Sequence, residues 1–245
     1  MTHIIHTQAE LETAIGILVE QHPRWQPVFE KTGMPALRRR EGGYAGLCSI
    51  VCGQQLSTAS AAAIRARLFA AFDPFHHDTV RLARGDKLAR LGLSRPKIKA
   101  IKEIGKAISK GHIDLDAVAA MEADQAHAAL TALHGIGPWT ADVYLLFCLR
   151  HADAWPAGDI AVQEAIKVGL GLKARPDAKQ MAPLAEPWRP LRGAAAHLWW
   201  SYYRVLKNRE GVIADKAGAA KARPAKVSLA KITPAKSPGP RARKR

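Results

Sequence analysis

Apolar residues recur at intervals of three and four along most of this 245-residue chain, with polar residues between them. That spacing places the apolar side chains on one face of a helix and predicts amphipathic α-helices. The segment TQAELETAIGILVEQ is typical, because Thr7 and Glu10 stand where a helix N-cap and its capping-box partner belong. No alternating pattern of useful length predicts a strand. The sequence therefore predicts an all-α body of about ten helices joined by short loops.

Glycines and prolines divide the predicted helices. YAGLCSIVCGQQLSTASAAAIRARLFAAF predicts one helix to about Cys52, a break at Gly53 and a second helix from Ser57. Further along, LHGIGPWTA places two glycines ahead of Pro138. Proline fits the first turn of a helix, where its missing N–H leaves no bond unmade. We therefore expect a helical hairpin over about 128–150, and further helices over IAVQEAIKVGL and RGAAAHLWWSYYRVLKNRE.

The charge of the chain is strongly basic and unevenly spread. The chain holds 37 Lys and Arg against 21 Asp and Glu, a formal charge of +16. Residues 216–245 carry ten of those basic residues and no acid, so residues 1–215 carry 27 − 21 = +6. Such an excess indicates a polyanionic partner, nucleic acid first and an anionic membrane surface second. The membrane alternative is disfavoured, because no predicted helix pairs a Lys-rich face with a wide apolar one.

The last thirty residues mix Lys, Ala, Pro and Ser and offer almost nothing to bury. That composition predicts disorder. We therefore divide the chain into a helical domain over 1–214 and a basic, disordered tail over 215–245. The tail is a candidate arm for sequence-independent DNA binding. A solvated tail without a dedicated role is the alternative.

Three cysteines, Cys48, Cys52 and Cys148, stand in apolar surroundings. Their odd number argues against a disulfide framework and for a reducing compartment. The N-terminal segment has no basic region ahead of an apolar one, so we predict no signal peptide. No apolar run approaches the roughly 18 residues that a membrane span needs. We expect an intracellular protein, cytoplasmic and nucleoid-associated, or nuclear in a eukaryote.

The glycine turn LHGIGPWTA suits a phosphate ligand. Gly135 and Gly137 permit a tight turn and let a ligand approach the backbone closely. The free N–H groups at the start of the next helix, together with its dipole, attract an anion such as a phosphodiester oxygen. Backbone donors position DNA without reading its sequence. An ordinary corner between two helices is the alternative.

Four segments together resemble one known family. LHGIGPWTADVYLLF followed by PAGDIAVQ is similar to the helix-hairpin-helix DNA glycosylases with the Gly-Pro-Asp motif, and most similar to their 3-methyladenine DNA glycosylase II (AlkA-like) branch. GLCSIVCGQQLSTASA, LGLSRPKIKAI and PWRPLRGAAAHLWW resemble three further segments of these glycosylases. The match spans about 44–203. It implies a two-lobed, all-helical fold with the active-site cleft between the lobes.

The resemblance assigns catalysis to Asp159, which stands 22 residues after Gly137 and directly before a predicted helix. A fixed carboxylate beside the anomeric carbon would stabilise the positive charge that develops as an N-glycosidic bond breaks. It would also orient or deprotonate a water molecule. From the residues alone, a helix N-cap without a chemical role is the alternative. Asp142 and Asp153 compete by proximity, but neither holds the family position.

Trp139 occupies the position at which bifunctional relatives carry a lysine, two residues past the second hairpin glycine. Without that amine no Schiff base forms with the sugar, so the resemblance implies a monofunctional enzyme without AP-lyase activity. Only Cys148 follows the hairpin, which is too few thiols for the four-cysteine iron–sulfur cluster of some relatives. We expect no cofactor and no catalytic metal, and at most a monovalent or divalent cation at the hairpin when DNA is bound.

The family also implies the residues that handle DNA. One glutamine of the pair Gln54 and Gln55 would wedge into the duplex and extrude the damaged base, and Gln55 is the better match. Hydrogen bonding at a helix end is the alternative. Trp139 is the first candidate wall of the base pocket, because an aromatic face attracts an electron-poor alkylpurine. The weaker candidates, since tryptophans of helical proteins more often lie in the core, are Tyr144, Trp188, Trp199 and Trp200. The expected phosphate contacts are Gly135, Ile136, Gly137, Trp139 and Thr140.

We therefore expect a monofunctional DNA glycosylase that excises alkylated purines of the 3-methyladenine and 7-methylguanine type from damaged double-stranded DNA in base excision repair, acting as a monomer. One alternative is the same fold directed at uracil, a deaminated purine or an oxidised base. Another is a non-catalytic helix-hairpin-helix DNA-binding protein. The breadth of substrates is open, because Pro-Ala-Gly precedes Asp159 where many relatives have a second acid in place of Gly158.

Overall fold

The computed structural model describes residues 4–221, and the side chains of residues 4–208. The chain divides into a unit of residues 1–207 and a unit of residues 208–245. The described residues hold no strand, only an isolated bridge between Ile4 and His151, which confirms the all-α prediction. The helices are α1 (Gln8–Gln21), α2 (Gln26–Thr32), α3 (Gly43–Gly53), α4 (Thr58–Ala70), α5 (His77–Leu82), α6 (Gly85–Arg90), α7 (Arg95–Ser109), α8 (Leu115–Ala119), α9 (Ala123–Thr131), α10 (Pro138–Tyr144), α11 (Ile160–Gly169), α12 (Ala178–Ala185) and α13 (Arg192–Lys221).

Local signals set the ends of these helices where the sequence places them. Thr7 caps α1 and accepts a hydrogen bond from the backbone N–H of Glu10 at 3.2 Å. α3 ends at Gly53, and the Ser57 hydroxyl accepts from the N–H of the third residue of α4 at 3.2 Å. Pro138 is the first residue of α10. The predicted break after α3 and the predicted start of the hairpin's second helix are therefore confirmed.

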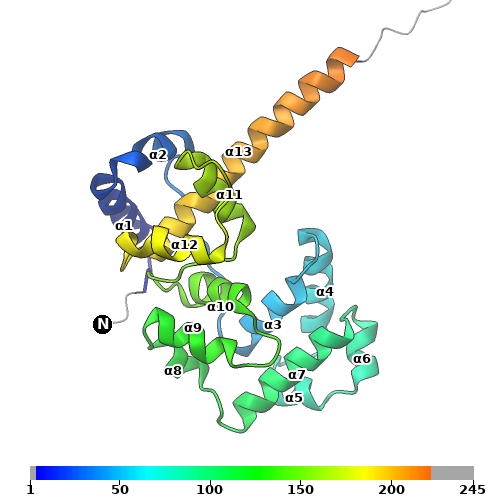
Figure 1. The fold of residues 1–245 in the computed structure, drawn as a ribbon. Helices are drawn as coiled ribbons and strands as arrows, with labels where there is room; N and C mark the ends of the chain where they lie inside the picture. Colours follow the sequence, from blue (N-terminus) through cyan, green and yellow to red (C-terminus); the bar gives the residue numbers. More distant parts are fainter. Residues whose placement is uncertain (1–3, 222–245) are drawn as a thin grey trace, which may run out of the picture. The chain divides into compact units, whose positions relative to one another are not determined.

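Within residues 1–207 the helices form two groups, as Figure 1 shows. α1, α2, α11, α12 and the start of α13 surround an aromatic core, in which the ring centroid of Trp25 lies 4.7 Å from that of Trp188 and 5.2 Å from that of Trp199. α3 to α9 form the second group, where α7 buries Ile101 and Ile104. α10 packs on α3 and α9, so the hairpin belongs to this second group.

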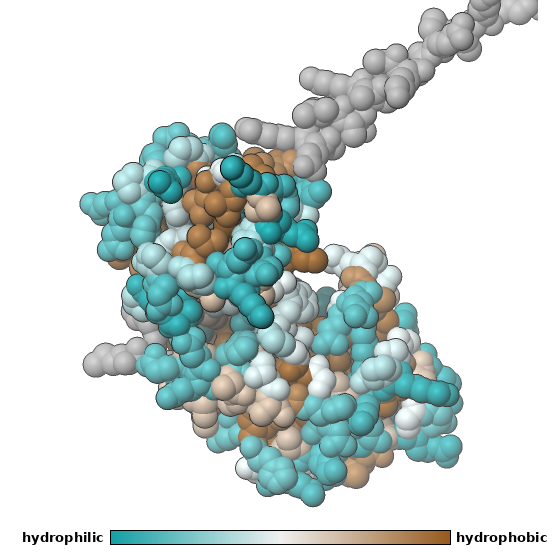
Figure 2. All heavy atoms as spheres, viewed as in Figure 1, coloured by the Kyte–Doolittle hydropathy of each residue, from teal (hydrophilic) through white to brown (hydrophobic). Residues whose placement is uncertain are grey.

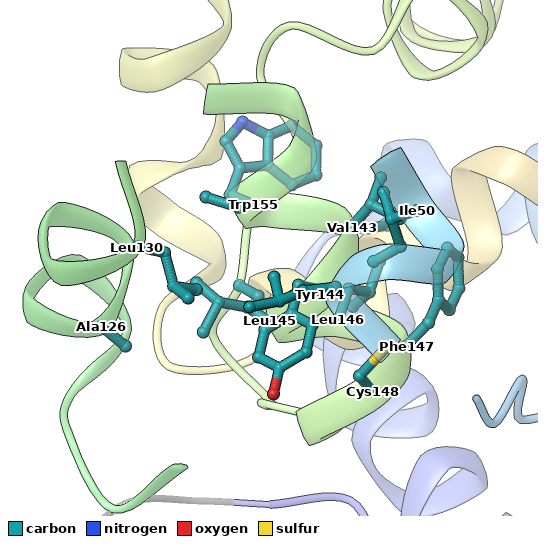
Figure 3. Packing of buried hydrophobic residues seen from close by; sticks show 14 of the residues in the cluster. Ile50, Ala126, Leu130, Val143, Tyr144, Leu145, Leu146, Phe147, Cys148 and Trp155 are labelled. Atoms are coloured by element: carbon teal, nitrogen blue, oxygen red, sulfur yellow. The ribbon is translucent and has the colours of Figure 1, made fainter. Parts of the chain in front are cut away.

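A buried segment joins the hairpin to the loop before α11. α10 continues into a π-helical turn, Leu145–Leu149, which ends at Arg150 in the left-handed region with φ +58°. Figure 3 shows Phe147 of this turn near Ile50 of α3, and Leu130 of α9 on the side of Leu145. Because most of its side chains are buried, this segment fixes the chain between the hairpin and Asp159.

The surface of the first unit is mixed. Hydrophilic residues cover much of the face drawn in Figure 2, and hydrophobic residues show between them. In the described part of the chain, no helix combines the length and the apolar character that crossing a membrane requires.

Two segments differ from the prediction. The Pro-rich segment MAPLAEPWRP, for which no helix is predicted, supplies the second half of α12, because Asp177 and Gln180 form a capping box that starts the helix ahead of Pro183. Residues 215–221, predicted to begin the disordered tail, are the end of α13. Alanine and lysine are good helix formers, which accounts for the extension. The rest of the predicted tail, 222–245, lies outside the described residues.

Candidate active site

Asp159 is the N-cap of α11, as the sequence predicts. Its backbone is extended, with φ −79° and ψ 116°. Its Oδ1 accepts hydrogen bonds from the backbone N–H groups of Ala161 at 2.9 Å and Val162 at 3.0 Å. Only 7% of the residue is exposed. The helix start therefore holds this carboxylate in one orientation within a largely buried site.

Two tryptophans bind the same carboxylate. Nε1 of Trp139, at the start of α10, donates to Asp159 Oδ2 at 2.8 Å. Nε1 of Trp200, in α13, donates to Asp159 Oδ1 at 3.0 Å. Asp159 thus accepts four N–H groups from three helices, and both of its oxygens are fixed. Trp139 keeps 38% of its surface exposed, so part of its ring is open to a ligand beside the carboxylate.

Trp200 is the site residue that sequence reasoning ranked too low. Its ring stacks on Phe147 with a centroid distance of 4.9 Å and an angle of 26° between the planes. Its neighbour Trp199 is fully buried in the core. Adjacent residues of a helix point about 100° apart, so the two tryptophans lie on different faces of α13. The sequence pattern does not say which of the two reaches Asp159.

Ion pairs anchor the loop that leads to Asp159. Arg192, at the start of α13, pairs with Asp153 at 2.8 Å, and Arg189 pairs with the same carboxylate at 2.7 Å. Both arginines also bind Asp124 of α9. Buried ion pairs with several hydrogen bonds fix geometry more than they add stability. Asp153 is thus committed to two arginines and does not compete with Asp159.

Asp142, the other rival carboxyl, is 6% exposed and lies one turn into α10. Burial raises its pKa to about 8; Arg192 opposes that rise and Asp159 adds to it. Asp142 lines a cavity of about 310 Å³ together with His127, whose Nε2 lies 3.4 Å from Asp142 Oδ1. A carboxyl with that pKa is mostly neutral at pH 7, and a neutral acid does not stabilise a developing cation. The geometry therefore favours Asp159.

The hairpin turn is tight at its first glycine and open at its second. Gly135 has φ +84°, and a Cβ there would stand 2.3 Å from the Cβ of Ala100 in α7. Nothing lies within 4 Å of a Cβ built on Gly137. The turn therefore packs against α7 on one side and leaves the backbone of Gly137 accessible on the other.

Four of the five expected phosphate contacts offer a free backbone donor. The N–H groups of Gly135, Gly137, Trp139 and Thr140 have no acceptor among the described residues. The N–H of Ile136 already donates to Leu133 O at 3.1 Å, and its side chain is buried. Ile136 therefore has no free N–H to offer a phosphate in this structure, because the turn itself uses its only backbone donor. Gly135 contributes the shape of the turn.

The two glutamines of the expected wedge have different surroundings. Gln54 Nε2 donates to Thr140 Oγ1 at 3.0 Å and approaches Gly135 O at 3.4 Å, so this side chain is bound to the hairpin. Gln55 is exposed and adopts the left-handed conformation with φ +55°. The alternative of hydrogen bonding near a helix end holds for Gln54. Gln55 alone keeps a side chain that is available to DNA.

Tyr144 and Trp188, the two other expected walls of the base pocket, are buried. Trp188 packs edge-on against Trp25 and Trp155, with centroid distances of 4.7 and 5.2 Å. Tyr144 is inaccessible within the segment that follows the hairpin. Both rings therefore fill the cores of the two helix groups, and neither is exposed as Trp139 is. An exposed indole face beside Asp159 comes from Trp139.

The hairpin carbonyl groups fit the cation expected there with DNA bound. Leu133 O and Gly137 O each accept one hydrogen bond from the chain, at 3.1 and 3.0 Å, which leaves each oxygen a second lone pair. Among the described side chains, one group has metal-ligand spacing, formed by His76, His77 and Asp78 at the start of α5. It lies outside the hairpin and the Asp159 site.

The three cysteines are unpaired and buried, as their surroundings predict. Burial raises the pKa of Cys52 to about 11 and that of Cys148 to about 12. Burial also raises the pKa of Cys48 well above its ordinary value. All three therefore serve as small apolar side chains in the core.

Comparison with known proteins identifies a matching family and several similar proteins. Residues 48–190 match the model of the HhH-GPD superfamily base excision DNA repair proteins. The DNA-3-methyladenine glycosylase of Bacillus subtilis is 27% identical over 176 residues, which cover 66% of this chain and 57% of that protein. The chain therefore spans little more than half the length of that relative.

Two solved structures share the fold. The DNA-3-methyladenine glycosidase of Bacillus halodurans superposes with a TM-score of 0.70 at 25% identity, covering 80% of this chain and 91% of that one. The 3-methyladenine DNA glycosylase of Schizosaccharomyces pombe, in complex with abasic DNA, gives 0.64 at 26% identity, covering 72% and 89%.

Proposed function

Because the chain belongs to the HhH-GPD superfamily of base excision DNA repair proteins, we propose that it is a DNA glycosylase that excises alkylated purines. The similar proteins from Bacillus subtilis, Bacillus halodurans and Schizosaccharomyces pombe all carry names of 3-methyladenine glycosylases. Asp159 is the proposed catalytic residue, and damaged double-stranded DNA is the proposed partner.

One observation carries the proposal: a single carboxylate held by four N–H donors beside an exposed indole. A helix cap alone needs only the backbone donors of Ala161 and Val162. The two indole N–H groups come from α10 and α13, so each reaches Asp159 from a helix other than the one that Asp159 caps. Such convergence supports a carboxylate that must keep one position while a substrate reacts beside it.

The reaction is hydrolysis of the N-glycosidic bond of an extruded nucleotide. As the bond between C1′ and the base nitrogen breaks, its electron pair leaves with the base and positive charge develops on C1′ and the ring oxygen. The carboxylate of Asp159 stabilises that charge. A water oxygen then bonds to C1′, and its proton passes to Asp159 as general base. The products are the free base and an abasic sugar.

Trp139 supplies the proposed contact with the base. An alkylated purine that carries positive charge is attracted to the negative face of an indole. The charge also makes the base a good leaving group, so the site needs no strong general acid. Trp200, backed by Phe147, presents its ring next to the same carboxylate and is the second proposed aromatic contact.

We propose that the enzyme has no AP-lyase activity. That step needs an amine that attacks C1′ to form a Schiff base, and Trp139 stands where bifunctional relatives have a lysine. Borohydride treatment during turnover should therefore trap no covalent complex between protein and DNA, and the abasic strand should stay intact until alkali is added. A trapped complex would overturn this part of the proposal.

The hairpin is the proposed phosphate contact. The free N–H groups of Gly137, Trp139 and Thr140 are available to a phosphodiester oxygen. A cation held by Leu133 O and Gly137 O would supply positive charge beside that phosphate. The proposed reaction uses the hairpin, Gln55, Trp139 and Asp159 of a single chain and needs no second subunit, so the proposed active form is a monomer.

The deciding experiment measures bases released from methylated DNA, identified by mass. Asp159→Asn should lower release by about a hundredfold or more, because asparagine keeps the helix cap and removes the negative charge. Asp177→Asn is the matched control, since Asp177 caps α12 and accepts a backbone N–H in the same way. Equal activity of the Asp159 variant and the wild type would mean that Asp159 is only a helix cap and would refute the proposed mechanism.

A panel of duplexes tests the substrate class. We expect release of 3-methyladenine and 7-methylguanine, and far slower release of uracil, hypoxanthine and 8-oxoguanine. Activity on neutral lesions alone would contradict the proposed substrate class, but it would not contradict the proposed role of Asp159. Binding without release of any base would favour the non-catalytic alternative.

A further inference from the structure

Lys97 binds the turn that carries Gln55. Lys97 is the third residue of α7, and its Nζ donates to Cys52 O at 2.9 Å and to Gln54 O at 2.8 Å. Both carbonyl groups lie at the end of α3, where a helix has acceptors without intrahelical partners. A cation there also matches the negative end of the helix dipole. The lysine is half-buried, so these bonds form in a partly dehydrated environment.

Gln54 extends this connection to the hairpin. Its carbonyl accepts from Lys97, while its side-chain amide donates to Thr140 Oγ1 at 3.0 Å. One residue thus joins the start of α7, the end of α3 and the start of α10. The turn after α3 and the phosphate-binding hairpin are therefore held as one body.

Gln55 occupies a conformation that needs such support. Its φ of +55° lies in the left-handed region, which residues other than glycine adopt at a cost. Its side chain is exposed, and the next residue, Leu56, donates from its N–H to Gly53 O at 3.3 Å. Locally, the backbone is closed by this bond and by the 3.3 Å bond that the N–H of Gln54 donates to Val51 O. The stronger bonds that define it are those from Lys97 to the preceding carbonyl groups.

We propose that Lys97 is a positioning residue for base extrusion: it fixes the turn from which Gln55 enters the duplex, without contacting the DNA itself. This inference rests on the proposed glycosylase function and on Gln55 as its wedge. Extrusion of a base requires a side chain that occupies the vacated space before the base returns. A turn free to relax from the left-handed conformation would withdraw Gln55 and lower the extruded fraction.

The same placement distinguishes Lys97 from its basic neighbours. Arg95 and Lys99, on the same helix, are exposed and make no bond to any described residue. Neither side chain supports the turn after α3, whereas the ammonium of Lys97 is used by two of its carbonyl groups. Lys99→Met therefore removes the same charge two residues away and is the matched control.

The test separates extrusion from chemistry. In the Asp159→Asn background, which keeps the base in place, 2-aminopurine beside the lesion reports extrusion through its fluorescence. Lys97→Met should lose at least half of the fluorescence rise at saturating protein. Lys97→Arg should restore it, because a guanidinium can also donate to two carbonyl oxygens. Lys99→Met should behave like the parent protein.

Excision with Asp159 intact gives a second readout. We expect Lys97→Met to lower excision about tenfold when the lesion is paired, and less than threefold when it lies opposite an abasic site, where extrusion is easy. An equal fall on both duplexes would mean general damage to the fold and would overturn the inference. So would a parent-like fluorescence rise. Absence of base release by the wild type on either duplex would instead refute the proposed function.

Discussion

Trp139 and Asp159 lie 20 positions apart in the chain, yet the indole Nε1 of the first donates a 2.8 Å hydrogen bond to Oδ2 of the second. The bond joins the residue that replaces the lysine of bifunctional relatives to the proposed catalytic carboxylate. Trp139 therefore has two roles in the proposed enzyme. Its N–H orients the carboxylate, and its exposed face is open to the base. In the proposed enzyme, an indole stands where the amine of a lysine would start a different reaction.

Trp200→Phe tests the other indole donor. The change removes the N–H that binds Asp159 Oδ1 and keeps an aromatic ring against Phe147. A hydrogen bond to a charged group contributes about 1.5–3 kcal/mol, so we expect excision to fall about tenfold to a hundredfold. Single-turnover rates on methylated duplex DNA measure it. Trp199→Phe is the control: its ring lies in the core, so its rate should match the wild type while its stability falls. Equal rates for the two variants would contradict the role of Trp200.

Gly135→Ala should destabilise the fold, whereas Gly137→Ala should not. A methyl group on Gly135 would overlap Ala100 in α7, and the φ of +84° strains any side chain. We expect a loss of about 2 kcal/mol or more, seen as a fall in Tm of roughly 4–8 °C. Gly137 has open space and ordinary backbone angles, so its variant should stay within about 0.5 kcal/mol of the wild type. Matching melting temperatures for the two variants would show that Gly135 is not in close contact with α7.

Asp142→Asn should change how stability depends on pH. Burial raises the pKa of Asp142 to about 8, so its neutral form is favoured in the folded state. The stability that this group contributes is present below its unfolded pKa, about 3.9, and is lost as the pH rises through about 8. Asparagine cannot ionise, so the variant does not lose this stability as the pH rises. From pH 5.5 to pH 8.5 the variant should gain about 1–3 kcal/mol relative to the wild type in urea titrations.

His127 bears on the same experiment. Burial lowers its pKa, so it acts in the opposite sense and lowers stability as the pH falls. That effect is present in both proteins and largely cancels in the difference. Parallel stability curves for the two proteins would show that Asp142 titrates in the folded state much as it does in the unfolded one.

The basic tail should add to DNA affinity through its charge. Residues 216–245 hold ten Lys and Arg and no acid. Their removal should weaken binding and flatten the slope of log affinity against log salt by about 0.9 for each DNA phosphate that the tail neutralises in the full-length protein. The excision rate at saturating DNA should not change. A full-length variant with those ten residues replaced by glutamine should match the truncation, and wild-type binding by that variant would refute a role for the charge.

Much of the fold follows from local sequence signals. The break between α3 and α4 is predicted because glycine favours a helix end at position 53 and serine favours a helix N-cap at position 57. Asp159 is predicted as a cap for the same reason, and its proposed chemistry comes from the family resemblance. α12 is not predicted because its prolines outweigh the capping pair Asp177 and Gln180, a signal that is present in the sequence.

The composition of the site is harder to predict, because it depends on which side of a helix faces the core. Trp188 and Trp200 lie in one segment that resembles the family, yet the first fills the aromatic core and the second binds Asp159. Gln54 and Gln55 are adjacent, and only the left-handed turn sends one to the hairpin and the other outward. No period of apolar residues encodes those choices. They are set by packing between segments far apart in the chain.

The buried cysteines have a consequence for a protein proposed to act on alkylated DNA. Reagents that methylate purines are electrophiles, and among protein groups the thiolate is their readiest target. Cys48, Cys52 and Cys148 are shielded from solvent, and their raised pKa keeps them in the less nucleophilic thiol form. The three thiols of the proposed enzyme are thus shielded from the reagents that create its proposed substrate.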